Sequence, residues 1–314
     1  MGAQVSGGRP EDAMSGRRKV RLLVNPRSGL RVGGPAVLRH VQEVWDSDER
    51  ELTIQFSRSA EDGKAKVARA IDEGVDTILV AGGDGMVNSI GAALIGTKVA
   101  LGVIPTGSGN GFARHFEIPL QPRAAAEALL NGRRTEVDVG VANDRPFFVT
   151  CSMAWDAAIA RSFQKSPVRG ILPYVLAAAY ELMEYRVQRF EVRLDDGPWR
   201  AFEEPMVFTA ANLTQFGGGA RIAPLALEND GLLELVIAEK GDAARIIPNL
   251  PRLFNGTMND TSGLQTYRFR KMSVRREKPF PIQLDGECLD SGPDVRVEVL
   301  PLALTVLAPR ARGE

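Results

Sequence analysis

The sequence predicts two domains, an α/β domain built on a parallel sheet followed by a mainly antiparallel β-sandwich domain. Three observations support this prediction. The chain has 314 residues, which is long for a single small domain. Up to about residue 135, short apolar runs alternate with segments of helical periodicity, as in parallel sheets. Beyond that point short strand-like runs dominate, which is typical of antiparallel β domains.

The first domain is predicted to alternate strands with helices. Each strand is a short apolar or alternating run, and each helix has apolar residues three or four positions apart. Ligands of such sheets bind beyond the carboxyl ends of the strands, so the turns that follow them are of most interest. The strands are expected at Val20–Val24, Leu52–Phe56, Thr77–Ala81 and Val99–Ile104, and the helices around Val37–Val44 and Val67–Ile71.

The second domain contains seven predicted strands and one helical patch, Ala243–Phe254, which Pro248 and Pro251 must break or kink. The strands are expected at Thr135–Val141, Phe147–Cys151, Phe190–Leu194, Met206–Asn212, Leu232–Ile237, Arg268–Val274 and Val295–Leu300. The domain limits expected from these patterns are a disordered tail over 1–17, the α/β domain over 18–135, the β-rich domain over 136–300, and a C-terminal segment over 301–314 that is a candidate for returning to the first domain.

Composition excludes some functions. Lys+Arg and Asp+Glu both number 39, so the formal net charge is zero and a nucleic-acid partner is not expected. Cys151 and Cys288 have no zinc-site spacing and form no disulfide framework, which predicts a reducing, cytoplasmic setting. No transmembrane segment is expected, because the apolar run Ile171–Met183 is too short to span a bilayer. We interpret that run as a buried or interdomain helix.

Three glycine-rich turns follow predicted strands, at Asn25–Gly29, Gly82–Asn88 and Pro105–Gly111. Glycine permits positive φ and close backbone approach, so consecutive N–H groups can point at one anion. The helix after each turn adds its positive end. Three such turns on one sheet predict a polyphosphate site. The P-loop motif is absent, and Phe112 stands where a dinucleotide fingerprint requires its last glycine.

Carboxylates accompany two of the sequence features. Asp84 lies within the second glycine turn, where it would hold Mg²⁺ or orient a hydroxyl nucleophile, although such residues also stabilise plain turns. Near the C-terminus, Asp285 and Glu287 flank Gly286. In an extended strand both carboxylates would project to the same side and raise each other's pKa, as suits a general base. The alternative is an ordinary Asp-Gly hairpin turn, and the spacing alone does not decide between them.

Together these features resemble the catalytic family of diacylglycerol kinases, which includes bacterial lipid kinases and sphingosine and ceramide kinases. The sequences NPRSG (25–29), GGDG (82–85), PTGSGN (105–110) and LDGE (284–287) match the family in order and spacing. The stretch at 216–237 is similar to the one before the family's structural metal site. The resemblance covers nearly the whole chain after the tail. It implies a first domain like those of NAD kinases and phosphofructokinases, which also carry GGDG.

The resemblance implies ATP and Mg²⁺ as cofactors and a lipid substrate at a membrane surface. Glu287 would be the general base, with Asp285 beside it and Asp84 as a third catalytic carboxylate. A structural magnesium would bind Asp230 and the backbone carbonyls of Leu227 and Leu232. The ATP site would be lined by Asn25, Pro26, Arg27, Ser28, Gly29, Ser57, Gly82, Gly83, Asp84, Gly85, Met86, Val87, Asn88 and Ser108.

The leading hypothesis is therefore an ATP-dependent lipid kinase that phosphorylates diacylglycerol or a related lipid. Two alternatives stay open, a soluble-substrate kinase of the NAD kinase type and a nucleotide-binding regulator that has lost catalysis. The second is kept because Met86 and Ser89 replace the Thr and Glu usual in the family. We expect a cytoplasmic protein, with peripheral attachment at the inner face of the membrane and a homodimer both left open. No motif identifies the lipid.

Overall fold

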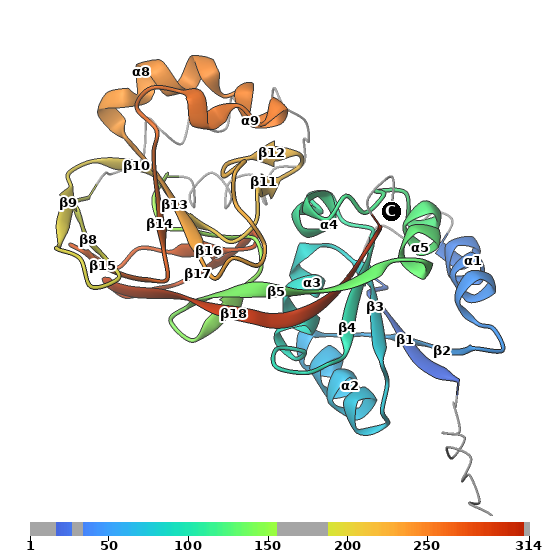
Figure 1. The fold of residues 1–314 in the computed structure, drawn as a ribbon. Coiled ribbons are helices and arrows are strands. Elements are labelled where there is room, and N and C mark those ends of the chain that lie inside the picture. Colours follow the sequence, from blue (N-terminus) through green and yellow to red (C-terminus); the bar gives the residue numbers. More distant parts are fainter. Residues whose placement is uncertain (1–16, 27–33, 156–187, 311–314) are drawn as a thin grey trace, which may run out of the picture.

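The structure, a computed structural model, describes residues 17–26, 34–155 and 188–310. It contains two domains side by side, each with its own apolar core (Figure 1). In the described ranges, no helix is both long and apolar enough to cross a membrane. Predictions for the tail up to residue 16, for Arg27, Ser28 and Gly29, for Ile171–Met183 and for residues 311–314 lie outside the described residues.

The first domain is a parallel sheet in the strand order β2-β1-β3-β4, which confirms the predicted α/β fold. All residues of β3 and β4 are buried, as expected for strands covered on both faces. Helix α1 packs with α5 and α2 with α3, and right-handed crossovers place α1 and α2 on opposite faces. The elements are β1 (Arg18–Val24), α1 (Gly34–Trp45), β2 (Arg50–Phe56), α2 (Ala60–Asp72), β3 (Thr77–Gly82), α3 (Asp84–Ala92), β4 (Ala100–Pro105), α4 (Gly111–His115) and α5 (Pro122–Leu130).

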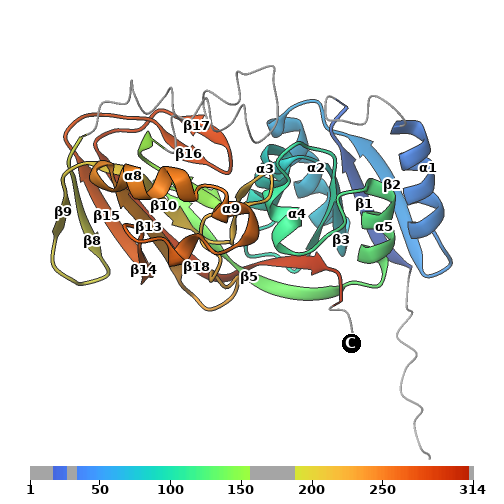
Figure 2. The same ribbon diagram turned by 90° about the horizontal axis from the view of Figure 1, so that it is seen from above.

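Two long strands, β5 (Arg133–Ala142) and β18 (Asp294–Ala308), connect the domains. They pair with each other along most of their length, with a register shift between Leu300 and Leu304. Beyond that shift β18 lies parallel to β4, where Val306 pairs with Leu101, so the end of the chain completes the sheet of the first domain. Both views show this pair of strands running from one domain to the other (Figures 1 and 2).

The second domain is a sandwich, as predicted. One layer is the antiparallel sheet β14-β13-β10-β7-β16-β17, and the other is the outer part of the large sheet, where β18, β15, β8 and β9 follow one another. A two-stranded hairpin, β11 (Gln215–Gly217) and β12 (Ala220–Arg221), stands apart. The remaining strands are β6 (Arg145–Phe147), β7 (Thr150–Ser152), β8 (Phe190–Leu194), β9 (Arg200–Phe202), β10 (Pro205–Ala211), β13 (Leu233–Glu239), β14 (Gln265–Phe269), β15 (Lys271–Arg276), β16 (Ile282–Leu284) and β17 (Glu287–Leu289).

The helical patch and one strand of the second domain can be compared in detail with the sequence prediction. The helical patch is broken as predicted, into α8 (Ala243–Ile246) and α9 (Arg252–Asn255), with prolines at the breaks. The run Arg268–Val274, expected as one strand, belongs to two antiparallel-sheet strands in different layers, β14 and β15, because the chain changes sheet at Arg270. The alternation changes phase at this point, because the buried Phe269 and Met272 are three positions apart, and the sequence interpretation missed that signal.

Candidate active site

The four parallel strands of the first domain end level with one another. Val24 pairs with Phe56 at the ends of β1 and β2, and Gly82 pairs with Pro105 at the ends of β3 and β4. The three glycine-rich turns therefore leave the sheet at one edge, as predicted for a ligand site. Of the first turn the structure describes Asn25 and Pro26, which follow β1 directly.

The second turn is shorter than its sequence suggests. Gly82 ends β3 and Gly83 is the N-cap of α3, so Asp84, Gly85, Met86, Val87 and Asn88 already belong to the helix. Gly83 offers no side-chain cap, and the first N–H groups of a helix have no partner within it. These donors and the positive end of the helix dipole point to the strand edge, which is an arrangement suited to binding an anion.

Gly83 of the second turn and Gly107 of the third are needed for close approach of the two turns, and neither has a positive φ. A Cβ on Gly107 would lie only 2.6 Å from the Cα of Gly83, so the two backbones lie directly against each other. Within these two turns the residue with positive φ is Asn110, at 52°. Its Oδ1 accepts the Gly107 N–H at 3.1 Å, and its Nδ2 donates to the Gly107 carbonyl at 2.8 Å. This closed turn leaves Ser108 exposed at its tip.

Ser57 lies at the same strand edge but is buried and engaged locally. Its N–H donates to the Val24 carbonyl at 2.8 Å, and its hydroxyl donates to the Ser59 carbonyl at 2.9 Å. Ser59 in turn caps α2 by accepting the Asp62 N–H. The placement beside the first turn agrees with the expected neighbourhood, and the nucleotide contact of Ser57 stays a prediction.

Asp84 faces the third turn and is partly buried, whereas its sequence position suggests a solvent-facing loop. Its Oδ1 accepts the N–H of Phe112 at 3.4 Å, so the carboxylate of one helix caps the start of the next, α4. Burial is the main cause that raises the pKa of Asp84 to about 6, and the nearby Asp285 charge adds to it. The N–H groups at the start of α4 act in the opposite direction. At neutral pH this carboxylate is therefore mostly ionised, close to its titration.

Asp285 occupies a hairpin turn, so of the two alternatives that the sequence left open the structure has the hairpin and not the extended strand with Asp285 and Glu287 on one side. The two-residue loop Asp285-Gly286, with φ of 48° and 93°, joins β16 to β17. Positive φ at both positions is the hairpin geometry that Asp-Gly favours. The turn nevertheless directs the Asp285 carboxylate inward. Its oxygens accept the N–H groups of Phe148 (2.8 Å), Val149 (2.7 Å) and Thr150 (3.1 Å) and the Nδ2 of Asn88 (2.8 Å).

The interacting carboxylates of the site are thus Asp84 and Asp285, rather than Asp285 and Glu287. Burial raises the pKa of Asp285 against the effect of its four donors. Asn88, one turn after Asp84 on α3, holds Asp285 and so brings the second domain to this helix. Glu287 begins β17 and pairs there with Leu284, while its side chain is exposed and makes no hydrogen bond or ion pair within the described ranges.

The predicted structural-metal residues lie in the segment before β13. The Asp230 carboxylate accepts the N–H of Leu232 at 3.0 Å and an N–H of the Arg268 guanidinium. Leu227 is exposed nearby in the chain. Among the described residues, no three His, Cys, Asp or Glu side chains group as a metal site, although backbone carbonyls are outside that comparison. The Asp230 carboxylate, which was expected to bind a magnesium ion, is thus paired with the Arg268 guanidinium. The metal ligands stay a prediction.

Two polar contacts that sequence reasoning missed fix the domains to each other. His115 on α4 lies with Nδ1 3.0 Å from the Thr214 hydroxyl and Nε2 3.5 Å from Glu228, and this contact is the main cause that lowers the pKa of Glu228 to about 2. The buried Asp138 on β5 accepts the N–H groups of Gly231 (2.6 Å) and Leu302 (2.8 Å). Their partners lie far away along the chain, so no local pattern could have indicated them.

Comparison with known families matches both halves of the chain. Residues 19–142 match the diacylglycerol kinase catalytic domain, and residues 150–308 match the YegS C-terminal NAD kinase beta sandwich-like domain. These ranges contain the parallel sheet with its turns and the sandwich with the Asp285 hairpin, respectively. The two structural halves of the site therefore correspond to two family domains in the same order.

Similar proteins of known sequence or structure extend this match over nearly the whole chain. A probable lipid kinase YegS-like of Pectobacterium atrosepticum is 33% identical, covering 92% of this chain and 95% of its own. A diacylglycerol kinase of Mycobacterium tuberculosis is 29% identical, covering 93% and 96%. The crystal structure of a diacylglycerol kinase from Bacillus anthracis, 19% identical, has the same fold with a TM-score of 0.70 over 93% of this chain and 97% of its own. The chain therefore belongs to the diacylglycerol kinase catalytic family, as a member with a YegS-type C-terminal domain.

Proposed function

We propose that this protein transfers the γ-phosphate of ATP to the hydroxyl group of a lipid, diacylglycerol or a related molecule. The observation that supports it most is the carboxylate pair Asp84 and Asp285 beside two facing glycine turns. Phosphoryl transfer depends mainly on positioning and on neutralising charge, and this edge of the sheet offers both helix N-termini and carboxylates. Relatives named lipid kinase and diacylglycerol kinase favour a lipid acceptor.

In this proposal the nucleotide phosphates lie against the second and third turns. The uncapped start of α3 offers its N–H groups, and Asn25 and Pro26 border the same edge from β1. Asp84 suits Mg²⁺, because hard cations prefer carboxylate oxygens and its pKa near 6 leaves it ionised at pH 7. Bound magnesium would neutralise charge on the transferring phosphate.

The proton of the lipid hydroxyl goes to Glu287 in this proposal. As the hydroxyl oxygen attacks the γ-phosphorus, the bond between that phosphorus and the ADP oxygen breaks, and the Glu287 carboxylate accepts the proton. Asp285 is the positioning residue, since its four hydrogen bonds hold the hairpin that presents Glu287. A lipid acceptor would bring the protein to a membrane surface, at the inner face if it is cytoplasmic. A homodimer stays a prediction.

The test is a transfer assay with radiolabelled ATP and a panel of extracted lipids, with the products separated by thin-layer chromatography. Glu287→Gln is nearly isosteric but cannot accept the proton, so we expect kcat to fall roughly 10²–10⁴-fold while ATP binding persists. Glu277→Gln, another exposed glutamate of the second domain, is the matched control and should keep full turnover. Unchanged kcat in a folded Glu287→Gln protein would remove Glu287 as the base.

The same assay separates the two alternatives. Label found only in water-soluble products would favour a kinase of the NAD kinase type. ATP binding without transfer to any lipid or soluble acceptor would favour a regulator that has lost catalysis, in which Met86 and Ser89 replace the family residues.

A further inference from the structure

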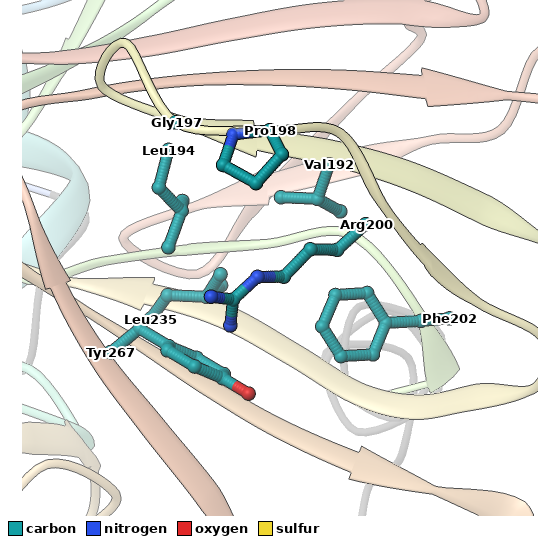
Figure 3. Close-up of a pocket in the computed structure, with 8 residues that line it drawn as sticks. All are labelled: Val192, Leu194, Gly197, Pro198, Arg200, Phe202, Leu235 and Tyr267. Atoms are coloured by element: carbon teal, nitrogen blue, oxygen red, sulfur yellow. The ribbon is translucent and has the colours of Figure 1, made fainter.

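A pocket opens at the outer end of the sandwich, away from the glycine turns. Figure 3 shows the residues that line it. It lies where the β8–β9 hairpin of one layer faces β13 and β14 of the other, and Figure 1 places β8 and β9 at the end of the molecule opposite the first domain. Its volume is about 90 Å³, which is smaller than a typical small-molecule site. Both sheets end here at edge strands, β9 and β14.

The wall of this pocket is apolar. Val192 and Leu194 line it from β8, Phe202 from β9, and Pro198 from the turn between these strands. Val192 and Phe202 are buried, so the inner wall continues the core of the sandwich. Such a surface favours methylene groups, because burying them removes apolar surface from water. The pocket therefore suits an alkyl chain better than a sugar or a nucleotide.

Arg200 places a positive charge at this apolar wall. Its guanidinium crosses the pocket and lies over the ring of Tyr267, with Cζ 5.5 Å from the ring centroid (Figure 3). Within the part of the chain that the structure describes, Arg200 makes no ion pair and no side-chain hydrogen bond. Stacking on an aromatic ring orients the planar guanidinium and leaves its N–H donors unused. Those donors match a carboxylate or a phosphate.

The other face of the same hairpin adds uncommitted positive charge. Arg193 and Arg275 both lie over the ring of Trp199, at 5.4 and 4.3 Å, and neither guanidinium has a hydrogen-bonding or ionic partner in the described ranges. The nearby Glu191 and Glu203 carboxylates are instead paired with Arg189. Asp195 and Asp196 lie in the turn between Leu194 and Gly197, but of the eight residues that line the pocket Arg200 is the charged one.

We propose that this pocket binds an anionic single-chain amphiphile, with its first methylenes on Val192, Leu194 and Phe202 and its carboxylate or phosphate head on Arg200. A volume of about 90 Å³ accommodates the first methylenes of one chain and not a two-chain phospholipid. The site is distinct from the edge of the parallel sheet and does not depend on the proposed phosphoryl transfer. It gives the protein a second contact with lipid chemistry.

Isothermal titration calorimetry without nucleotide tests this proposal, with decanoate and decyl phosphate as probes and decanol, acetate and inorganic phosphate as comparisons. Wild type should bind both decyl anions. Decanol lacks the charged head and so loses the charged hydrogen bond, whereas acetate and phosphate lack the alkyl chain. Each of the three should therefore bind at least roughly tenfold more weakly. Arg200→Gln should weaken decanoate binding roughly tenfold to hundredfold. The matched control is Arg296→Gln on β18, an exposed arginine of the same sheet away from the pocket.

A second readout locates the ligand. Trp199 is the exposed tryptophan of the chain's described part, because Trp45 and Trp155 are buried, so decanoate should change its fluorescence in wild type. Leu194→Phe should fill the pocket and abolish binding. If that variant does not fold, the comparison of Arg200→Gln with its control Arg296→Gln still tests the proposal. The proposal is overturned if decanol binds as tightly as decanoate, if Arg296→Gln weakens binding as much as Arg200→Gln, or if no decyl anion binds at millimolar concentration.

Discussion

Gly107→Ala would show whether the second and third turns must lie back to back. The added Cβ would meet the Gly83 Cα at 2.6 Å and the Asn110 Oδ1 at 2.9 Å. Ordinary carbon contacts are about 3.5–4.0 Å, so the turns would have to separate by roughly 1 Å. Neither neighbour yields easily, because one is backbone and the other is held by two hydrogen bonds. Overpacking of this kind costs about 1–3 kcal/mol, and a misplacement of about 1 Å can cost about 10²-fold in rate.

The matched control is Gly241→Ala, just after β13, where an added Cβ meets no atom within 4 Å. Thermal unfolding, binding of a fluorescent ATP analogue and the labelled transfer assay are measured for both variants. We expect Gly107→Ala to melt about 2–4 °C lower for each kcal/mol lost and to transfer phosphate about 10²-fold more slowly. Wild-type nucleotide binding and turnover in Gly107→Ala would refute the idea that the phosphates are held between these turns.

Two further predictions concern charge. The pKa of Asp84 rises from 3.8 to about 6 on folding, so its contribution to stability is complete below pH 3.8 and is lost as pH rises through 6. As the pH rises through this window, the melting temperature of wild type should fall relative to that of Asp84→Asn. Asp285→Asn removes the nearby charge and should move this fall to lower pH. If wild type and Asp84→Asn show the same dependence of melting temperature on pH, the prediction is contradicted. Because Arg268 occupies the Asp230 carboxylate, Mg²⁺ should raise the melting temperature of Arg268→Ala more than that of wild type, with Arg270→Ala as control. Equal responses in all three would count against a cation site at Asp230.

The parallel sheet and its turns could be predicted because their signals are local. A buried strand such as Thr77–Gly82 appears in the sequence as a short apolar run, and the glycines after it mark the turn. The structural role of those glycines was predicted only in part. The close approach of Gly83 and Gly107 depends on which turns meet in space, which the local sequence does not show. In these two turns the positive φ is found at Asn110 and not at a glycine.

The environment of Asp285 could not be predicted from the sequence around it. The Asp-Gly pair allowed either a hairpin or an extended segment, and nothing nearby in the chain decides which. Its side-chain partners are remote, with Asn88 at a separation of 197 residues and Thr150 at 135. The Arg268 contact with Asp230 is missing from sequence reasoning for the same reason, since it joins the turn before β13 to a residue of β14 that lies 38 positions further along the chain.

The hairpin and the functional interpretations of Asp285 are compatible, and the structure explains why. A residue in a strand of this sheet would direct its side chain to one face, whereas the turn directs the carboxylate toward the N–H groups of Phe148, Val149 and Thr150 and toward Asn88 on α3. The second domain therefore supplies Asp285 and Glu287, and the first domain supplies Asp84 and the turns. The site exists only while the two domains are docked, and the pairing of β5 with β18 across the boundary holds them together with the hydrogen bond from Asn88 to Asp285 and the contacts of His115.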